Sequence, residues 1–242
     1  RFSSSYPELP EVLSGEVVMS SSLSSFSFSS SSLSFSSSST GTVVGCPSWS
    51  RKNREMEIIG FWPSYGSGPI PWGKITQLNY AFGIPTSQGG LNANLATLQS
   101  LVITGHQNGV EVWLSIGGAG YSDVYPSMAA NSQYRATFVE NVRSFAQQSC
   151  IDGVDIDWES WSGSASGTVN PQESALLTTM LSELRAVLAP LNIKLSTDVY
   201  PSDWNGRHYE AAIITHIDQL NVMAYDFTGS WSPAGNHSSY ND

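Results

Sequence analysis

The sequence predicts an α/β protein whose parallel strands form a (β/α)₈ barrel, with about six of the eight strands present. From residue 57 onward, apolar runs typical of strands alternate with helical patterns, which predicts parallel strands joined by right-handed crossovers. Polar signatures fall at the carboxyl ends of three such runs, at residues 115–118, 155–159 and 225–226. A barrel builds its site from several strand ends, whereas a doubly wound sheet gathers it at one switch point, so the barrel is favoured.

The apolar periodicity gives the order of the predicted elements. Strands are expected at residues 58–62, 75–83, 112–118, 153–159, 194–200 and 219–227, and helices at about 94–106, 133–148, 172–188 and 208–216. The third helix carries one apolar stripe, which we interpret as core packing. Its members are Leu176, Leu177, Met180, Leu181, Leu184 and Leu188.

The amino-terminal part of the chain has a different texture. Residues 20–39 contain 15 Ser, and such a stretch cannot bury enough apolar surface to offset the entropy lost on ordering. We therefore expect residues 1–56 to be a disordered, low-complexity segment and residues 57–242 to form the barrel part.

Composition excludes several classes of partner. The net charge is −10, which repels nucleic acid and suits an uncharged polymer such as a polysaccharide. The eight Trp offer flat faces for stacking on sugars. No apolar run approaches the roughly 18 residues that suggest a membrane span, and no signal-peptide pattern follows Arg1, so we expect the amino terminus to be incomplete.

Cysteines and histidines give no metal signature. Cys46 and Cys150 lack metal-ligand spacing, and the sequence leaves a single disulfide and two free thiols equally open. The four histidines show no zinc-type spacing and are interpreted as structural or surface residues.

The octapeptide at residues 152–159, DGVDIDWE, carries the strongest chemical signal. Asp155, Asp157 and Glu159 alternate with Val154, Ile156 and Trp158, so a strand would place the acids on one face, with Cα atoms about 6.5–7 Å apart. A solvated strand face is the plain alternative. The apolar opposite face and the helix that follows predict a strand covered by helices, and acids on it must meet at a cleft or remain unpaired.

From about residue 57 to its end, the chain resembles the family 18 glycoside hydrolases, the chitinases. Residues 152–159 match the family's DGxDxDxE strand, residues 114–118 (LSIGG) its SxGG segment, residues 221–229 (NVMAYDFTG) its MxYDxxG segment, and residues 80–82 (YAF) its YAF-type strand end. Four matches in the family's order and spacing make the resemblance specific.

The resemblance implies retaining hydrolysis of β-1,4-linked N-acetylglucosamine, with the substrate's acetamido oxygen as nucleophile. Glu159 would be the general acid, Asp157 would orient the acetamido group, and Asp155 would share a proton with Asp157. Ser115 would hydrogen-bond Asp155, and the Tyr225 hydroxyl would hold the acetamido oxygen for attack.

The remaining residues expected to contact substrate also follow from the resemblance. They are Asp226, Met223, Ser115, Gly118, Tyr80, Phe82 and Phe61. Chitin or chito-oligosaccharides are the implied ligands. We expect no metal or organic cofactor, no nucleic acid, no membrane and no obligate protein partner, and we expect an extracellular location.

Two departures from the family pattern concern the site. Phe61 stands where many relatives have a Tyr that touches the middle acid, and residues 160–162 (SWS) follow Glu159 without the usual Pro. Only six strands are visible, so we expect a carboxyl-terminally truncated fragment that by itself is poorly soluble or inactive. Three rival functions remain: an endo-β-N-acetylglucosaminidase on N-glycans, a chitin lectin, and an inert fragment.

Overall fold

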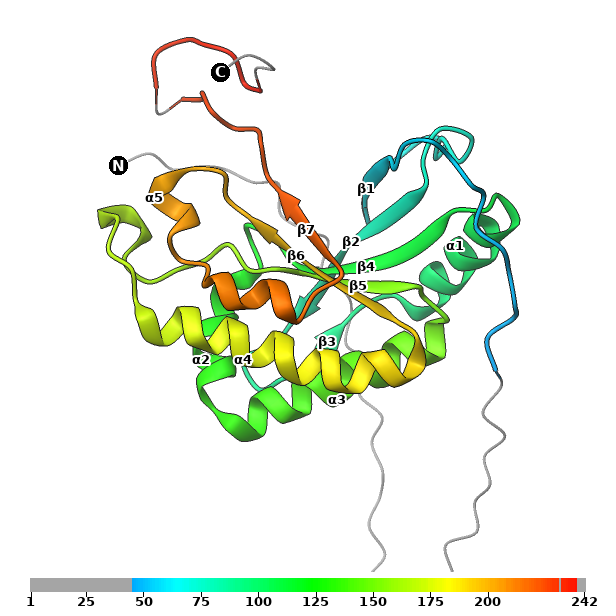
Figure 1. Cartoon of the computed structure of the whole chain (residues 1–242), viewed down its shortest axis with the longest axis horizontal. Helices are drawn as coiled ribbons and strands as arrows, with labels where there is room; N and C mark the ends of the chain where they lie inside the picture. Colours follow the sequence, from blue (N-terminus) through cyan, green and yellow to red (C-terminus); the bar gives the residue numbers. More distant parts are fainter. Residues whose placement is uncertain (1–44, 231, 239–242) are drawn as a thin grey trace, which may run out of the picture. The chain divides into compact units, whose positions relative to one another are not determined.

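Six parallel strands form one curled sheet in the order β1-β2-β4-β5-β6-β7, and the short β3 pairs antiparallel with β2 (Figure 1). The computed structural model describes residues 45–230 and 232–238, apart from the side chains of residues 203 and 204. The strands are β1 (Ile59–Pro63), β2 (Gln77–Pro85), β3 (Leu91–Asn92), β4 (Glu111–Gly117), β5 (Gly153–Asp157), β6 (Lys194–Val199) and β7 (Gln219–Val222). This curled six-stranded sheet is an incomplete (β/α)₈ barrel, which confirms the expected fold class.

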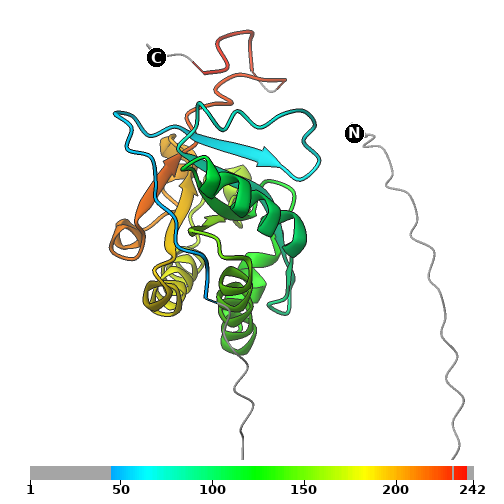
Figure 2. The ribbon, with the colours of Figure 1, turned by 90° about the vertical axis from the view of Figure 1, so that its right-hand side faces the viewer.

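Helices cover one face of the sheet (Figure 1, Figure 2). They are α1 (Leu95–Gln107), α2 (Tyr125–Ala130), α3 (Ser132–Ser149) and α4 (Pro171–Leu188), and the short α5 (Asp203–Gly206) follows β6. The three long helices each begin at an asparagine whose side chain accepts a hydrogen bond from a backbone N–H of the first turn. This cap satisfies donors that the helix itself leaves free.

Helix α4 shows how the expected apolar stripe is used. Leu177, Met180, Leu181, Leu184 and Leu188 are fully buried in the main core cluster. The segment Pro171–Leu191 is long and apolar enough to cross a membrane by length and composition. Burial of the stripe explains that composition by packing against the sheet.

Some expected elements differ in extent. The strand expected at 219–227 ends at Val222, and the helix expected at 208–216 is a 3₁₀ segment, Ala211–Thr215. Strand β7 ends where its pairing with β6 ends, at Val222. The segment Ala211–Thr215 is too short to gain much from α-helical propagation and forms a 3₁₀ turn instead. Strand β3 and helix α2 were not expected, because both are too short to show a period.

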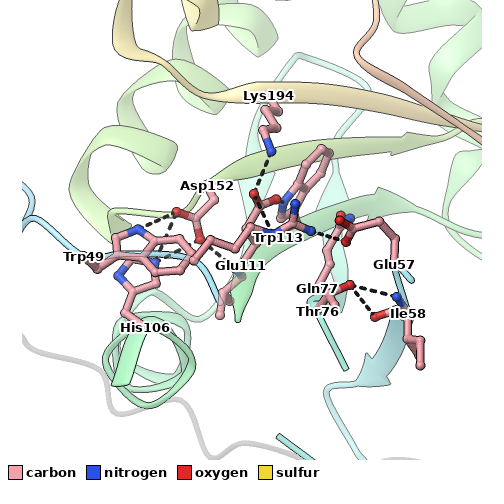
Figure 3. A network of polar contacts seen from close by, with 12 residues as sticks. Trp49, Glu57, Ile58, Thr76, Gln77, His106, Glu111, Trp113, Asp152 and Lys194 are labelled. Carbon is pink, nitrogen blue, oxygen red and sulfur yellow. Dashed lines mark hydrogen bonds and ion pairs between the residues drawn. The ribbon is translucent and has the colours of Figure 1, made fainter. Parts of the chain in front are cut away.

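Residues 45–56 were expected to lie outside the barrel part but belong to the same compact unit, which begins at Gly45. The Trp49 indole stacks on His106, with ring centroids 4.1 Å apart, and donates a hydrogen bond to Asp152 Oδ1 at 3.1 Å. Figure 3 shows these rings beside Asp152, which also accepts from Val112 N at 2.7 Å. The expected boundary at residue 56 therefore moves to residue 45, because long-range contacts decide it. The Ser-rich stretch lies outside the described residues.

Figure 3 also shows a buried acid that links strands β4 and β6 near their amino ends. Glu111 is 5% exposed, accepts from Trp113 Nε1 at 3.0 Å, and pairs with Lys194 Nζ at 2.6 Å. The pairing satisfies a carboxylate that would otherwise be buried without a partner.

Cys46 and Cys150 form a disulfide, which decides the question that the sequence left open. The bond ties the first described residues to the end of α3 across a separation of 104 residues. A cross-link that closes so long a loop removes conformational entropy from the unfolded chain.

We predict that the double variant Cys46→Ser, Cys150→Ser has a free energy of unfolding lower by about 2–4 kcal/mol, because its unfolded state regains loop entropy. Equilibrium urea unfolding measures the difference. As a control, a thiol reductant should destabilise the wild type and leave the double variant unchanged. Equal stability of the oxidised wild type and the variant would contradict the prediction.

Candidate active site

Asp155 lies at the centre of a polar row that runs across four neighbouring strands. The parallel register puts Ser115 of β4 on one side of it and Ser196 of β6 on the other. Ser115 Oγ donates to Asp155 Oδ2 at 2.7 Å, as expected, while Ser196 Oγ at 2.5 Å and Asn221 Nδ2 at 3.0 Å donate to Oδ1. Three donors therefore satisfy a carboxyl group that is fully buried.

Asp157 and Glu159 follow Asp155 at the carboxyl end of β5. Asp157 is 5% exposed, and its carboxyl group lies within hydrogen-bonding reach of that of Glu159. Its Oδ1 atom has no hydrogen-bond partner among the described residues. On the other side of Glu159, the Tyr200 hydroxyl donates to Oε2 at 2.8 Å.

Burial raises the pKa values of both Asp157 and Glu159. Desolvation, followed by the charges of Glu159 and Asp155, raises the pKa of Asp157 to about 8. Desolvation also raises the pKa of Glu159, and hydrogen bonds from Tyr200 and Asp157 partly oppose that rise. Both carboxyl groups are therefore harder to ionise than free carboxyl groups, and a raised pKa favours the protonated form that a general acid needs.

The backbone after β5 is held by the loop that follows β4. Ser122 Oγ accepts hydrogen bonds from Glu159 N at 3.2 Å and Ser160 N at 3.1 Å. Behind it, Trp158 stacks on Tyr125 and on Trp161, with ring centroids 5.1 and 5.0 Å apart. These contacts fix where the Glu159 side chain leaves the main chain.

Residues after β7 complete the acid-lined end of the sheet. Partial burial and the charges of nearby acids raise the pKa of Tyr225 to about 12, so its hydroxyl stays protonated. Met223 is buried, while Asp226 is exposed, pairs with His237 Nδ1 at 3.2 Å, and acts electrostatically on Glu159. Tyr225 and Asp226 thus lie within electrostatic reach of the acids.

Of the other residues expected to contact substrate, Tyr80 lies on a different face of the sheet from the acids. Gly118 lies against Phe82, since a Cβ there would be 2.8 Å from the ring, and Phe61 is 45% exposed on β1. Tyr80 is different, because it pairs in register with Leu114 and belongs to the hydrophobic core. The strand alternation turns Tyr80 to the helix-covered face, so the expectation that it contacts substrate is wrong.

One strand of the site, β6, was not expected to carry site residues. Ser196, Asp198 and Tyr200 alternate along β6 and just beyond it, with the spacing of Asp155, Asp157 and Glu159 on β5. That alternation was visible in the run at residues 194–200 and could have indicated a second polar strand face. Asn221 gave no such signal, since only the fold brings it to Asp155.

Comparisons with known proteins agree with this geometry. The family model described as glycosyl hydrolases family 18 matches residues 49–241. A chitinase-like effector from Moniliophthora perniciosa is 35% identical over 186 residues, 72% of this chain and 42% of that protein. Chitinase 1 from Aphanocladium album is 30% identical over 154 residues, 61% of this chain and 36% of that protein.

Among solved structures, a chitinase from Rhizomucor miehei superposes with a TM-score of 0.63 at 23% identity, covering 71% of this chain and 58% of that one. The chain belongs to glycosyl hydrolases family 18. It spans about 36–58% of the length of these three relatives. The activity, substrate and partners of the whole protein can therefore only be proposed.

We predict that Tyr200→Phe raises the pKa of Glu159, because the lost hydrogen bond favours the ionised carboxyl group. Carbon-13 NMR titration of the carboxyl groups measures the change. Tyr209→Phe is the matched control, since the Tyr209 hydroxyl donates to the Trp158 carbonyl at 3.3 Å and not to an acid. An equal shift in both variants, or none in Tyr200→Phe, would contradict the assignment.

Proposed function

We propose that the whole protein hydrolyses β-1,4-linked N-acetylglucosamine polymers, that is chitin, with retention and with the substrate's acetamido group as nucleophile. The observation that carries the proposal is the pair of carboxyl groups of Asp157 and Glu159 at the carboxyl end of β5, where Tyr200 donates to Glu159 and both pKa values are raised. The two groups would share one proton. Barrel enzymes place their chemistry at that end of the strands.

Asp157 has an acceptor ready for the substrate. Its Oδ1 atom is buried and lacks a partner among the described residues, which is costly unless a ligand supplies a donor. The acetamido N–H of the sugar is such a donor. Accepting it favours the ionised form of Asp157, so the shared proton passes to Glu159.

Glu159 then acts as general acid. It donates its proton to the glycosidic oxygen, the C1–oxygen bond breaks, and the acetamido oxygen attacks C1 to form a cyclic oxazolinium ion. The Glu159 carboxylate next takes a proton from water while the water oxygen attacks C1, which reopens the ring and regenerates the acid. Two displacements at C1 retain its configuration.

Tyr225 and its neighbours position the sugar. The protonated Tyr225 hydroxyl lies within electrostatic reach of the acids and would donate to the acetamido oxygen, holding it in line with C1. Met223 and Asp226 would contact the same sugar ring. Phe61, Phe82 and Gly118 would line the adjoining part of the cleft. No step needs a metal or organic cofactor.

A second candidate is chitin binding without turnover, which the relative called a chitinase-like effector favours. For either function we propose an extracellular location, supported by the Cys46–Cys150 disulfide, because disulfides persist mainly in oxidising compartments.

We predict that Glu159→Gln lowers the turnover of chito-oligosaccharides by about 10²–10⁴-fold, the usual contribution of a general acid, while binding persists. Initial rates and calorimetric affinities measure the two effects. Glu140→Gln on the exposed side of α3 is the control and should leave both unchanged. Near wild-type turnover in Glu159→Gln would overturn the hydrolytic proposal, and wild-type binding without turnover would favour the second candidate.

We predict that deacetylation of the sugar at the cleaved bond abolishes hydrolysis, because the nucleophile is then absent. Asp157→Asn should slow cleavage of the acetylated oligomer by about 10²-fold or more through lost orientation and charge stabilisation. Mass spectrometry of the products compares the two substrates. Equal cleavage of both would indicate a carboxylate nucleophile on the protein instead.

A further inference from the structure

A fourth buried acid, Asp198 of β6, lies at the site beside the three acids of β5. Asp198 is 3% exposed. It lies two residues after Ser196, and Ser196 pairs in register with Asp155. Alternation along the strand puts Asp198 on the same face as Ser196 and level with Asp157. On its other side it pairs in register with Asn221.

The four acids lie in two close pairs. The Asp198 carboxyl group is within hydrogen-bonding reach of Asp155, and that of Asp157 is within reach of Glu159. Two ionised carboxyl groups cannot hydrogen-bond each other, because neither has a donor, so a hydrogen bond within a pair needs a proton on one partner. The Asp155 oxygen atoms already accept from Ser115, Ser196 and Asn221.

The groups facing Asp198 disfavour its ionised form. Its acidic neighbours are Asp155, Asp157 and Glu159, and the hydroxyls of Tyr209 and Tyr225 lie within electrostatic reach. Burial first, and then these acids, raise the pKa of Asp198 well above its usual range. Its Oδ2 atom has no hydrogen-bond partner among the described residues.

We propose that Asp198 is a positioning residue that stays protonated and donates to Asp155, so that Asp157 remains turned towards Glu159 in the resting site. Without this donor, Asp155 becomes an acceptor for the proton of Asp157, and Asp157 turns away from Glu159. The inference deepens the proposed hydrolytic function and rests on it.

Two substitutions at one position separate the roles of the residue. Asp198→Asn keeps a donor for Asp155 and cannot ionise, whereas Asp198→Ala removes the donor. Thr197→Ala is the structural control, because Thr197 is buried on the opposite face of β6 and donates to the Ile156 carbonyl at 2.7 Å. It weakens the strand without touching an acid.

We expect Asp198→Asn to keep kcat within about threefold of the wild type and Asp198→Ala to lose about 10–100-fold in kcat, the range for a lost hydrogen bond to a charged group. KM should change little, and Thr197→Ala should change stability but not the pH profile. Equal losses in Asp198→Asn and Asp198→Ala would overturn the proposal, because they would mean that the carboxylate itself is needed.

Two measurements need no turnover. A protonated Asp198 has a folded pKa above its unfolded value, so the wild type loses stability relative to Asp198→Asn as pH rises above about 4. Crystal structures should show Asp157 turned to Asp155 in Asp198→Ala and to Glu159 in Asp198→Asn. A wild type that gains relative stability with rising pH, or an unchanged Asp157 in Asp198→Ala, would overturn the proposal. If both results hold while no variant hydrolyses chitin, the proposed function alone fails.

Discussion

The site depends on one constraint, the parallel register of β4, β5 and β6 around Asp155. Because side chains alternate along a strand, this register alone puts a hydroxyl group on each side of the buried carboxyl group. A shift of one residue in β4 or β6 would turn the hydroxyl group of that strand to the helix-covered face and remove one of the donors to Asp155.

Desolvation raises the pKa values of Asp157, Glu159 and Asp198. The acids lie where water is largely excluded, so their pKa values depend on burial first and on one another second. Ionisation of all the carboxyl groups together is unfavourable, because several negative charges in a low dielectric would repel strongly. Tyr200 opposes this rise in pKa at Glu159 by donating a hydrogen bond to its carboxyl group.

The main chain that carries Glu159 is supported from the helix side. A stack of rings runs from Tyr125 through Trp158 and Trp161 to His208, with centroids 5.0–5.2 Å apart. The apolar side chains of the DGVDIDWE strand thus hold in place the strand whose other face carries the acids. Their burial anchors the strand end, while Ser122 holds the backbone of Glu159 and Ser160.

The sequence by itself determined the alternation of strands and helices, the acidic face of β5 and its neighbours at Ser115 and Tyr225, because these are patterns within one segment. Only the tertiary structure decided that Asp155 is satisfied from β6 and β7 as well as β4, that Tyr80 faces the core, and that Trp49 and Cys46 belong to the domain. It also decided that Asp198 lies among the acids. Each of these facts is a contact between residues distant in the chain, and local periodicity carries no information about which segments the fold brings together.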